Sequence, residues 1–159
     1  MRATDGLVRS VLERAVSQSA TLALAESCTG GGIAAAITDA PGASAVLTHG
    51  VVAYANEAKR DLLGVPMALI EAEGAVSRAV AGRMASGALA VSGAGVALSV
   101  TGIAGPGGGS PAKPVGLVWF GVARAGCPVR CERRVFGGDR SAVRRQAVET
   151  GLRLILAAL

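Results

Sequence analysis

The sequence predicts a three-layer α/β/α fold with a mixed β-sheet, formed by one domain that spans residues 1–159. Short apolar segments alternate with helical patterns along most of the chain, which is typical of a sheet covered by helices on both faces. Near the C-terminus two apolar segments are separated only by a short turn around Ala125-Gly126, which predicts an antiparallel hairpin. The sheet should therefore contain both parallel and antiparallel strands.

The helices are predicted from apolar residues that recur about every 3.6 positions, and from the residues that end these patterns. Pro41-Gly42 ends one helix, Gly64 another, and Ser77 and Asp139 are expected N-caps. Helices are expected over residues 5–19, 29–38, 57–63, 66–73, 77–91 and 139–158. Strands are expected over residues 21–25, 46–54, 96–100, 117–123 and 129–136, with an irregularity near His49 and Gly50. Only one Trp, one Tyr and two Phe occur, so Ala, Val, Leu and Ile must build the core.

Composition narrows the class of protein. The net charge of +5 comes mostly from arginines that are spread along the chain, and aromatic stacking residues are nearly absent, so we do not expect nucleic acid as a partner. No apolar run approaches the roughly 18–20 residues of a membrane span, and the N-terminus does not resemble a secretory leader, so we expect a cytoplasmic protein. Three cysteines without a CxxC pair and a single histidine predict neither a metal site nor a cofactor; Cys127 and Cys131 are expected to face a sheet.

The turn Glu26-Ser27-Cys28-Thr29-Gly30-Gly31 lies between a predicted strand and a predicted helix. Ligands of α/β proteins bind at the carboxyl ends of the strands, and a helix N-terminus offers N–H donors to an anion or oxyanion. Ser27 and Thr29 bring hydroxyl groups to this place, while Gly30 and Gly31 let a substrate approach the backbone. Spacing favours this interpretation and simple helix capping equally.

A second strand-to-helix corner contains Tyr54, Asn56 and Lys59. Asn56 is the expected N-cap, which puts Lys59 in the first helical turn, where the helix dipole disfavours a cation. This position should lower the pKa of Lys59, and burial would lower it further. A neutral lysine can act as the general base of a serine nucleophile, whereas an exposed lysine would have no such role.

Two further segments follow predicted strands. Thr101 precedes a Gly/Pro-rich loop over residues 102–114, whose N–H groups, including those of Gly102 and Gly105, could hold a phosphate or carboxylate. Arg140 follows Asp139 at the start of the last helix and could bind an anionic ligand. Arg144 and Arg145 are expected to be solvated helix residues, although either could assist Arg140. The match of residues 110–113 to the Ser-x-x-Lys motif is rejected, because proline and glycines disfavour the helix that this motif needs.

Eight short segments, taken together and in order, resemble the family of CinA C-terminal domains, which includes stand-alone nicotinamide-mononucleotide deamidases. These segments are residues 25–31, 41–44, 50–59, 64–65, 74–77, 101–106, 113–116 and 138–140. The resemblance implies hydrolysis of the carboxamide of nicotinamide mononucleotide without a metal. It implies Ser27 as nucleophile and Lys59 as base, and it matches Ser44, Tyr54, Thr101 and Arg140 to other active-site positions.

The combined prediction is an amidase whose catalytic residues are Ser27, Lys59, Tyr54 and Thr101. Its small-molecule substrate, nicotinamide mononucleotide, is expected to bind to eight further residues, and the protein is expected to form a homo-oligomer. The expected binding residues are Thr29, Gly30, Gly31, Ser44, Asn56, Gly102, Gly105 and Arg140. Two alternatives stay open, a nucleotide-binding module without turnover and an interaction protein in DNA uptake or damage response.

Overall fold

The computed structural model describes residues 4–159 as five strands and six α-helices around one sheet. The strands are β1 (Leu22–Glu26), β2 (Leu47–Val52), β3 (Val96–Gly102), β4 (Leu117–Arg124) and β5 (Arg130–Val135). The helices are α1 (Asp5–Ser17), α2 (Gly32–Thr38), α3 (Asn56–Leu63), α4 (Met67–Glu73), α5 (Arg78–Ser92) and α6 (Arg140–Ala158), and a short 3₁₀ helix, η1 (Ala43–Ala45), precedes β2.

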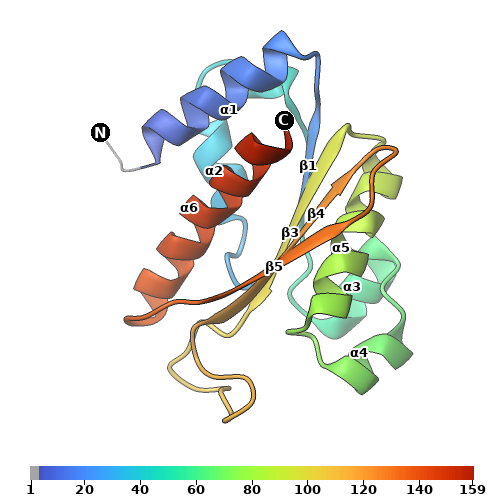
Figure 1. Ribbon diagram of the computed structural model, residues 1–159, viewed down its shortest axis with the longest axis vertical. Helices are drawn as coiled ribbons and strands as arrows, with labels where there is room; N and C mark the ends of the chain where they lie inside the picture. Colours follow the sequence, from blue (N-terminus) through green and yellow to red (C-terminus); the bar gives the residue numbers. More distant parts are fainter. Residues whose placement is uncertain (1–3) are drawn as a thin grey trace.

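The helices form one layer on each face of the sheet. Figure 1 shows α1, α2 and α6 on one face and α3, α4 and α5 on the other. The predicted α/β/α class is therefore confirmed. Two of the three predicted N-caps are as expected: the side chains of Ser77 and Asp139 accept hydrogen bonds from Val80 N and Ala142 N.

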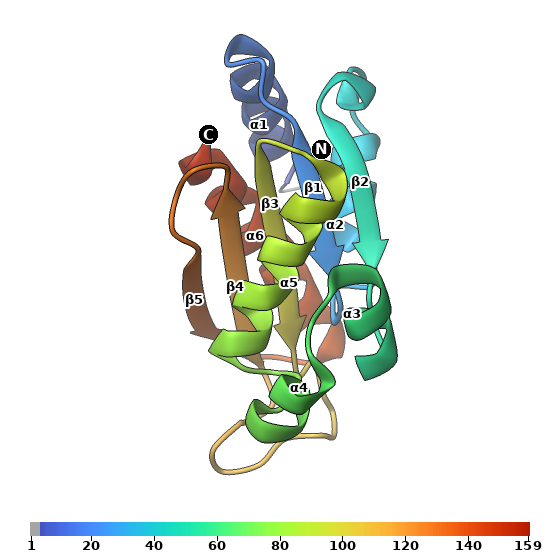
Figure 2. The ribbon, with the colours of Figure 1, turned by 90° about the vertical axis from the view of Figure 1, so that its right-hand side faces the viewer.

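The sheet has the strand order β2-β1-β3-β4-β5. β1 pairs in parallel with both β2 and β3, whereas β4 pairs antiparallel with β3 and β5, so the sheet is mixed. Figure 2 shows β2 and β5 at the two edges. Because β1, β2 and β3 run in one direction, their carboxyl ends meet at one end of the sheet. The expected irregularity in β2 is present: the register shifts between Leu22 and Ala23, which pair with Leu47 and His49.

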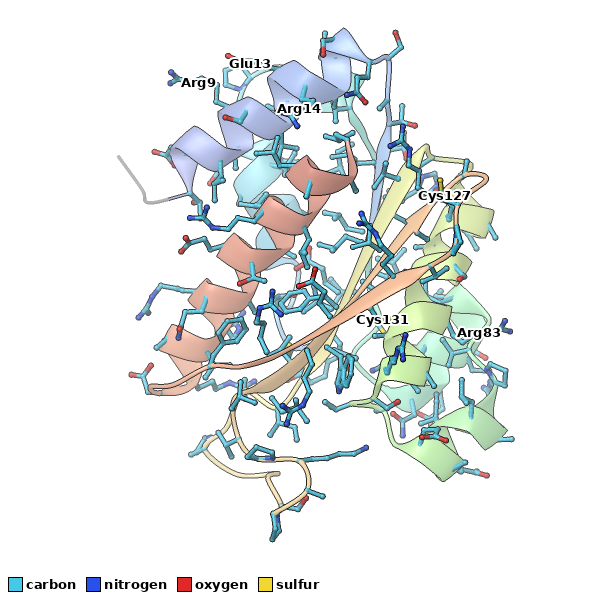
Figure 3. All side chains as sticks on the ribbon, in the orientation of Figure 1. Arg9, Glu13, Arg14, Arg83, Cys127 and Cys131 are labelled. Atoms are coloured by element: carbon cyan, nitrogen blue, oxygen red, sulfur yellow. The ribbon has the colours of Figure 1, made fainter. Side chains whose placement is uncertain are left out.

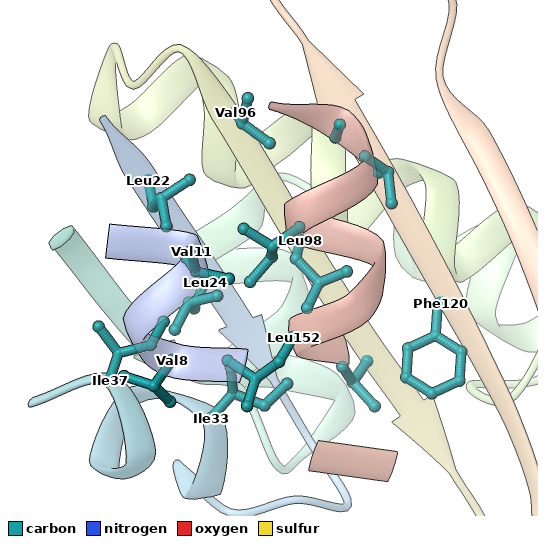
Figure 4. Close-up of a cluster of buried hydrophobic side chains, with 14 of the residues drawn as sticks. Val8, Val11, Leu22, Leu24, Ile33, Ile37, Val96, Leu98, Phe120 and Leu152 are labelled. Atoms are coloured by element: carbon teal, nitrogen blue, oxygen red, sulfur yellow. The ribbon is translucent and has the colours of Figure 1, made fainter. Parts of the chain in front are cut away.

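Each face of the sheet has its own aliphatic core. Val8, Leu24, Leu98 and Leu152 belong to the cluster under α1, α2 and α6 (Figure 4). A second cluster, which includes Met84, packs α3, α4 and α5 on the other face. The helices approach closely because small residues stand at the contacts: a Cβ added to Gly87 of α5 would lie 1.9 Å from the Leu63 carbonyl oxygen at the end of α3.

Two local predictions are wrong. The N-cap of α3 is Ala55 and not Asn56, and no side chain caps this helix, so Asn56 is its first helical residue. Cys127 lies in the exposed β4–β5 connection and does not face the sheet, because β5 begins only at Arg130. Cys131 lies on β5 and is partly exposed (Figure 3). Within residues 4–159, no helix is both long and apolar enough to cross a membrane.

Candidate functional site

A cavity of about 290 Å³ lies at the carboxyl ends of β1, β2 and β3. Residues from five parts of the chain line it, one of which is Ala75-Val76 before α5, and four of these parts contain most of the predicted site residues. They are Ser27 and Cys28 after β1, Tyr54, Asn56 and Lys59 around the start of α3, Thr101 to Gly105 at the end of β3, and Arg140 at the start of α6. The cavity is at the small end of the range for ligand sites.

Glu26 fixes the turn that carries Ser27. Its side chain is buried, and its carboxylate oxygens accept hydrogen bonds from Ile33 N at 3.0 Å and Ala34 N at 2.8 Å. These N–H groups belong to the first turn of α2 and have no partner within the helix, and a carboxylate is a favourable acceptor there. Glu26 therefore folds the turn back on α2 and holds Ser27 at the rim of the cavity.

Lys59 contacts Ser27 directly. Its Nζ lies 3.2 Å from Ser27 Oγ, 3.0 Å from the Ala53 carbonyl oxygen and 3.2 Å from the Tyr54 carbonyl oxygen. The Lys59 side chain is buried, with 1% of the residue exposed. Burial lowers the pKa of Lys59 below its usual value of 10.5. The Ser27 hydroxyl therefore lies beside an amine that loses its proton more readily than a lysine in water does. A serine nucleophile with a lysine base requires such a pair.

Cys28 is the neighbouring sulfur nucleophile, but its chemistry differs. Burial raises the pKa of the Cys28 thiol to about 11. Near neutral pH the sulfur therefore stays protonated, and the thiolate that nucleophilic attack needs is scarce. Ser27, with its contact to Lys59, is the better placed nucleophile of the two.

The backbone of the same turn leaves N–H donors available. Ser27 N donates to the Val100 carbonyl and Gly30 N donates to the Ser27 carbonyl. Among residues 4–159, the N–H groups of Cys28 and Thr29 donate to no backbone carbonyl. Positive φ angles at Gly30 (60°) and Gly31 (89°) allow the sharp reversal that leads into α2.

Thr101 connects the end of β3 to the segment before α5 on the other side of the cavity. Its hydroxyl donates to the Ala75 carbonyl oxygen at 2.9 Å, and Ala75 itself lines the cavity. On the exposed side, Lys113 Nζ donates to the Glu73 carbonyl oxygen at 2.6 Å, so the Gly/Pro loop is held against the end of α4. Ser110 and Lys113 form a tight turn instead of a helix, which confirms that the Ser-x-x-Lys match has no structural basis.

Arg140 bridges the mouth of the cavity. One guanidinium nitrogen donates to the Gly105 carbonyl oxygen at 2.8 Å, and the other donates to the Tyr54 hydroxyl at 3.1 Å. The Tyr54 side chain is largely exposed, while its carbonyl accepts from Lys59. Arg140 thus places a positive charge at the opening, where it meets both the Gly/Pro loop and the β2–α3 corner.

Arg144 is exposed, as expected, but its guanidinium also contacts the turn that carries Ser27. Its Nε donates to the Cys28 carbonyl oxygen at 3.2 Å, and an Nη donates to the Thr29 carbonyl oxygen at 3.1 Å. The sequence could not predict these contacts, because a helical pattern does not show which surface arginine faces a loop more than 100 positions away. Glu26 was missed for a similar reason, since its partners lie seven and eight residues ahead, across the turn.

Four of the expected binding residues do not line this cavity. Thr29, Gly30 and Gly31 belong to the turn but are not among the lining residues, and Thr29 lines a separate cavity between α2 and α6. Ser44 lies in η1, before β2, and is therefore at the amino end of the strand whose carboxyl end meets the site.

In residues 4–159, no group of three or more His, Cys, Asp or Glu side chains is placed to hold a metal ion.

The sequence profile of the CinA C-terminal domain matches residues 4–159. The chain belongs to this family. A relative from Pseudomonas putida, named nicotinamide-nucleotide amidohydrolase PncC, is 54% identical over 134 residues, which are 84% of this chain and 83% of the relative. The predicted family resemblance is thereby confirmed, and the family includes a protein named as an amidohydrolase.

Other members of the CinA family agree in sequence and in fold. A CinA-like protein from Geobacter sulfurreducens is 58% identical over 83% of this chain, and this chain spans about a third of the length of that relative. A crystal structure of a competence/damage inducible protein from Agrobacterium tumefaciens superposes with a TM-score of 0.96 at 42% identity, over 99% of this chain and 96% of the other. A protein of the same kind from Klebsiella pneumoniae gives 0.94 at 36% identity, over 98% and 96%.

Proposed function

We propose that this chain hydrolyses the carboxamide of nicotinamide mononucleotide to give nicotinic acid mononucleotide and ammonia. The observation that carries the proposal is the contact between Ser27 Oγ and the buried Lys59 Nζ, in a cavity at the carboxyl ends of the parallel strands. The name of the Pseudomonas putida relative supports this reaction class and substrate. No cofactor or metal ion takes part in the reaction as proposed.

In the first half of the reaction, Ser27 Oγ attacks the amide carbon and neutral Lys59 takes the hydroxyl proton. The C–O bond to Ser27 forms as the amide carbonyl becomes an oxyanion. When this intermediate collapses, the C–N bond breaks, and Lys59 returns its proton to the departing nitrogen, which leaves as ammonia. In the second half, water attacks the ester while Lys59 takes its proton; the C–O bond to Ser27 breaks, and the proton restores the Ser27 hydroxyl.

The oxyanion needs hydrogen-bond donors that are in place before charge develops. The N–H group of Cys28, next to the nucleophile, is the first candidate, because Cys28 lines the cavity and its N–H donates to no backbone carbonyl. The Thr29 N–H is the second. Glu26 and Arg144 hold the turn from its two ends, so the direction of these N–H groups is set by the fold and not by the substrate.

The rest of the cavity is assigned to substrate binding. Arg140 provides the positive charge for the 5′-phosphate, and the backbone of Gly102 and Gly105 lines the same side. Tyr54 and Thr101 orient the reacting groups, and Asn56 supplies an amide at the wall near Lys59. Gly30 and Gly31 are not among the lining residues, and they contribute through the sharp turn that their positive φ angles allow.

The experiment is an ammonia-release assay with nicotinamide mononucleotide on the wild type and on Ser27→Ala. The control variant is Ser10→Ala, which removes an exposed hydroxyl on α1. We expect release by the wild type and Ser10→Ala, and loss of release by Ser27→Ala by a factor of about 10³ or more. Full activity of Ser27→Ala would exclude the covalent scheme. Binding of the nucleotide by the wild type without any ammonia would instead favour a nucleotide-binding module.

A further inference from the structure

A second cavity, larger than the first, lies between α2 and α6. Its volume is about 710 Å³, and Gly32, Ala35 and Ala36 of α2 form one wall. Val148 and the long polar side chains of α6 line the other side. This combination of small and apolar walls with a few polar groups is the usual composition of a small-molecule site. The proposed amidase reaction makes no use of this space.

One polar group at this cavity lacks a hydrogen-bond partner. Thr29 is 1% exposed and lines the cavity, and its hydroxyl is the one buried side-chain oxygen or nitrogen in residues 4–159 without a partner. A buried hydroxyl without a hydrogen bond is energetically unfavourable, so such groups are rare unless something satisfies them. A ligand that fills the cavity could provide the missing partner.

One charged group is also available. Arg145 lines the cavity, and its guanidinium makes no hydrogen bond or ion pair with another residue in the part of the chain that the structure describes. Arg144 beside it is occupied by the Cys28 and Thr29 carbonyls, and Glu149 accepts a hydrogen bond from Arg153. Arg145 is therefore the cation that an incoming anion would meet, against walls that suit an apolar body.

We propose that the α2–α6 cavity is a second ligand site, which takes a small amphipathic anion with an apolar body and one acidic group. The acidic group pairs with Arg145, the apolar part packs on Ala35, Ala36 and Val148, and a polar atom reaches the Thr29 hydroxyl. The site is separate from the Ser27–Lys59 cavity, but Thr29 and Arg144 connect the two. Both residues line the second cavity; Thr29 belongs to the turn that carries Ser27, and Arg144 donates a hydrogen bond to the carbonyl oxygen of Thr29.

The test uses the fluorescent dye 1-anilinonaphthalene-8-sulfonate, an apolar ring system with one sulfonate. We expect saturable binding of one dye per folded chain. Arg145→Gln should weaken this binding about tenfold, since one charged pair is lost. Ala35→Leu should weaken it by at least as much, because the added side chain fills the cavity from an exposed position of α2. The charge control is Arg133→Gln, an exposed arginine of β5 that lines neither cavity.

Near-ultraviolet circular dichroism of each variant verifies that the dye reports on folded protein. Equal dye affinity in the wild type, Arg145→Gln and Ala35→Leu would overturn the proposal, and so would an equal loss in Arg133→Gln. Displacement of the dye by nicotinamide mononucleotide would place it in the Ser27–Lys59 cavity and would also overturn it. Because the readout is binding, the result does not depend on whether the chain releases ammonia.

Discussion

Lys59 Nζ lies 3.2 Å from Ser27 Oγ, although 32 positions separate the two residues in the chain. The parallel pairing of β1 and β2 brings them together, because both residues follow the carboxyl end of one of these strands. Two backbone carbonyls also accept from the amine, and within residues 4–159 no carboxylate forms an ion pair with it. Its proton affinity is thus set mainly by burial, which is the basis of the first prediction.

The activity should rise with pH through the pKa of Lys59. Burial lowers that pKa. In the proposed reaction only the neutral amine can take the Ser27 proton, so kcat/KM should increase as Lys59 loses its proton, which occurs below the usual pKa of 10.5. Lys59→Arg, which stays protonated, should lose nearly all activity near pH 7. A pH–rate profile from pH 6 to 10 checks this, and a profile that falls over that range would contradict it.

The lowered pKa of Lys59 should also make the free energy of unfolding rise with pH, as it does for activity. Between the lowered folded pKa and the unfolded pKa, the unfolded chain binds more protons at residue 59, so the free energy of unfolding should rise with pH in that window. Below the folded pKa, the full cost of burying the charge is present. Urea unfolding at several pH values compares this slope in the wild type and in Lys59→Met, which should lack the contribution.

Arg144 should act as a positioning residue for the turn that carries Ser27. Arg144→Ala removes the hydrogen bonds to the Cys28 and Thr29 carbonyls, so kcat should fall by about tenfold to a hundredfold as the N–H donors lose their alignment. KM should change little, because Arg144 does not line the Ser27–Lys59 cavity. The control is Arg153→Ala, which breaks only an exposed ion pair on the same helix. A rise in KM at unchanged kcat would argue for substrate contact instead.

Arg140 should discriminate in favour of a phosphate. Arg140→Ala should raise KM for nicotinamide mononucleotide by about tenfold to a hundredfold, the effect of losing a hydrogen bond to a charged group. For nicotinamide riboside, which lacks the phosphate, the same change should have little effect. Steady-state kinetics with both substrates measures the ratio, and an equal loss for both would move the phosphate site elsewhere.

Gly87 should be essential for stability and not for chemistry. An added Cβ would lie 1.9 Å from the Leu63 carbonyl oxygen, so Gly87→Ala must push α3 away from α5 and should lower the free energy of unfolding by at least ~2 kcal/mol. In Gly82→Ala, in the same helix, the added Cβ would meet only side-chain atoms, the Cys131 sulfur at 3.2 Å and a Val129 methyl group at 3.8 Å, and the change should be close to neutral. Chemical denaturation of the two variants measures the difference; equal stability would mean that the helices separate at little cost.

The two cysteines at the extremes of exposure should differ in their reaction with a thiol reagent such as 5,5′-dithiobis(2-nitrobenzoic acid). Cys127 is exposed in the β4–β5 turn and should react at once. Cys28 is buried, with its pKa raised to about 11 by desolvation, and should react only after unfolding. Cys127→Ser should therefore remove the fast phase. A fast phase that disappears in Cys28→Ser would reveal an accessible thiolate beside Ser27.

The sequence predicted the layers of the fold and the strand-to-helix turns of the site better than it predicted individual side-chain hydrogen bonds. Apolar periodicity gave the order of strands and helices, and the carboxyl-end rule placed Ser27, Lys59, Thr101 and Arg140 at one end of the sheet. Ser44 was expected from resemblance alone, and in one chain it lies at the amino end of β2. Glu26 and Arg144 could not be predicted, because hydrogen bonds to turn backbone leave no periodic pattern in a sequence.

The cavity is assembled from β1, β2, β3 and α6, so a refolding chain should regain its secondary structure before it regains a complete site. Nothing near the N-terminus can complete the site alone, because Arg140 and Arg144 come from the last helix, more than 100 positions after Ser27. Such distant contacts form late, after the loss of chain entropy that they require. Recovery of ammonia release during refolding should therefore lag behind the return of helical circular dichroism, and the delay would report the docking of α6.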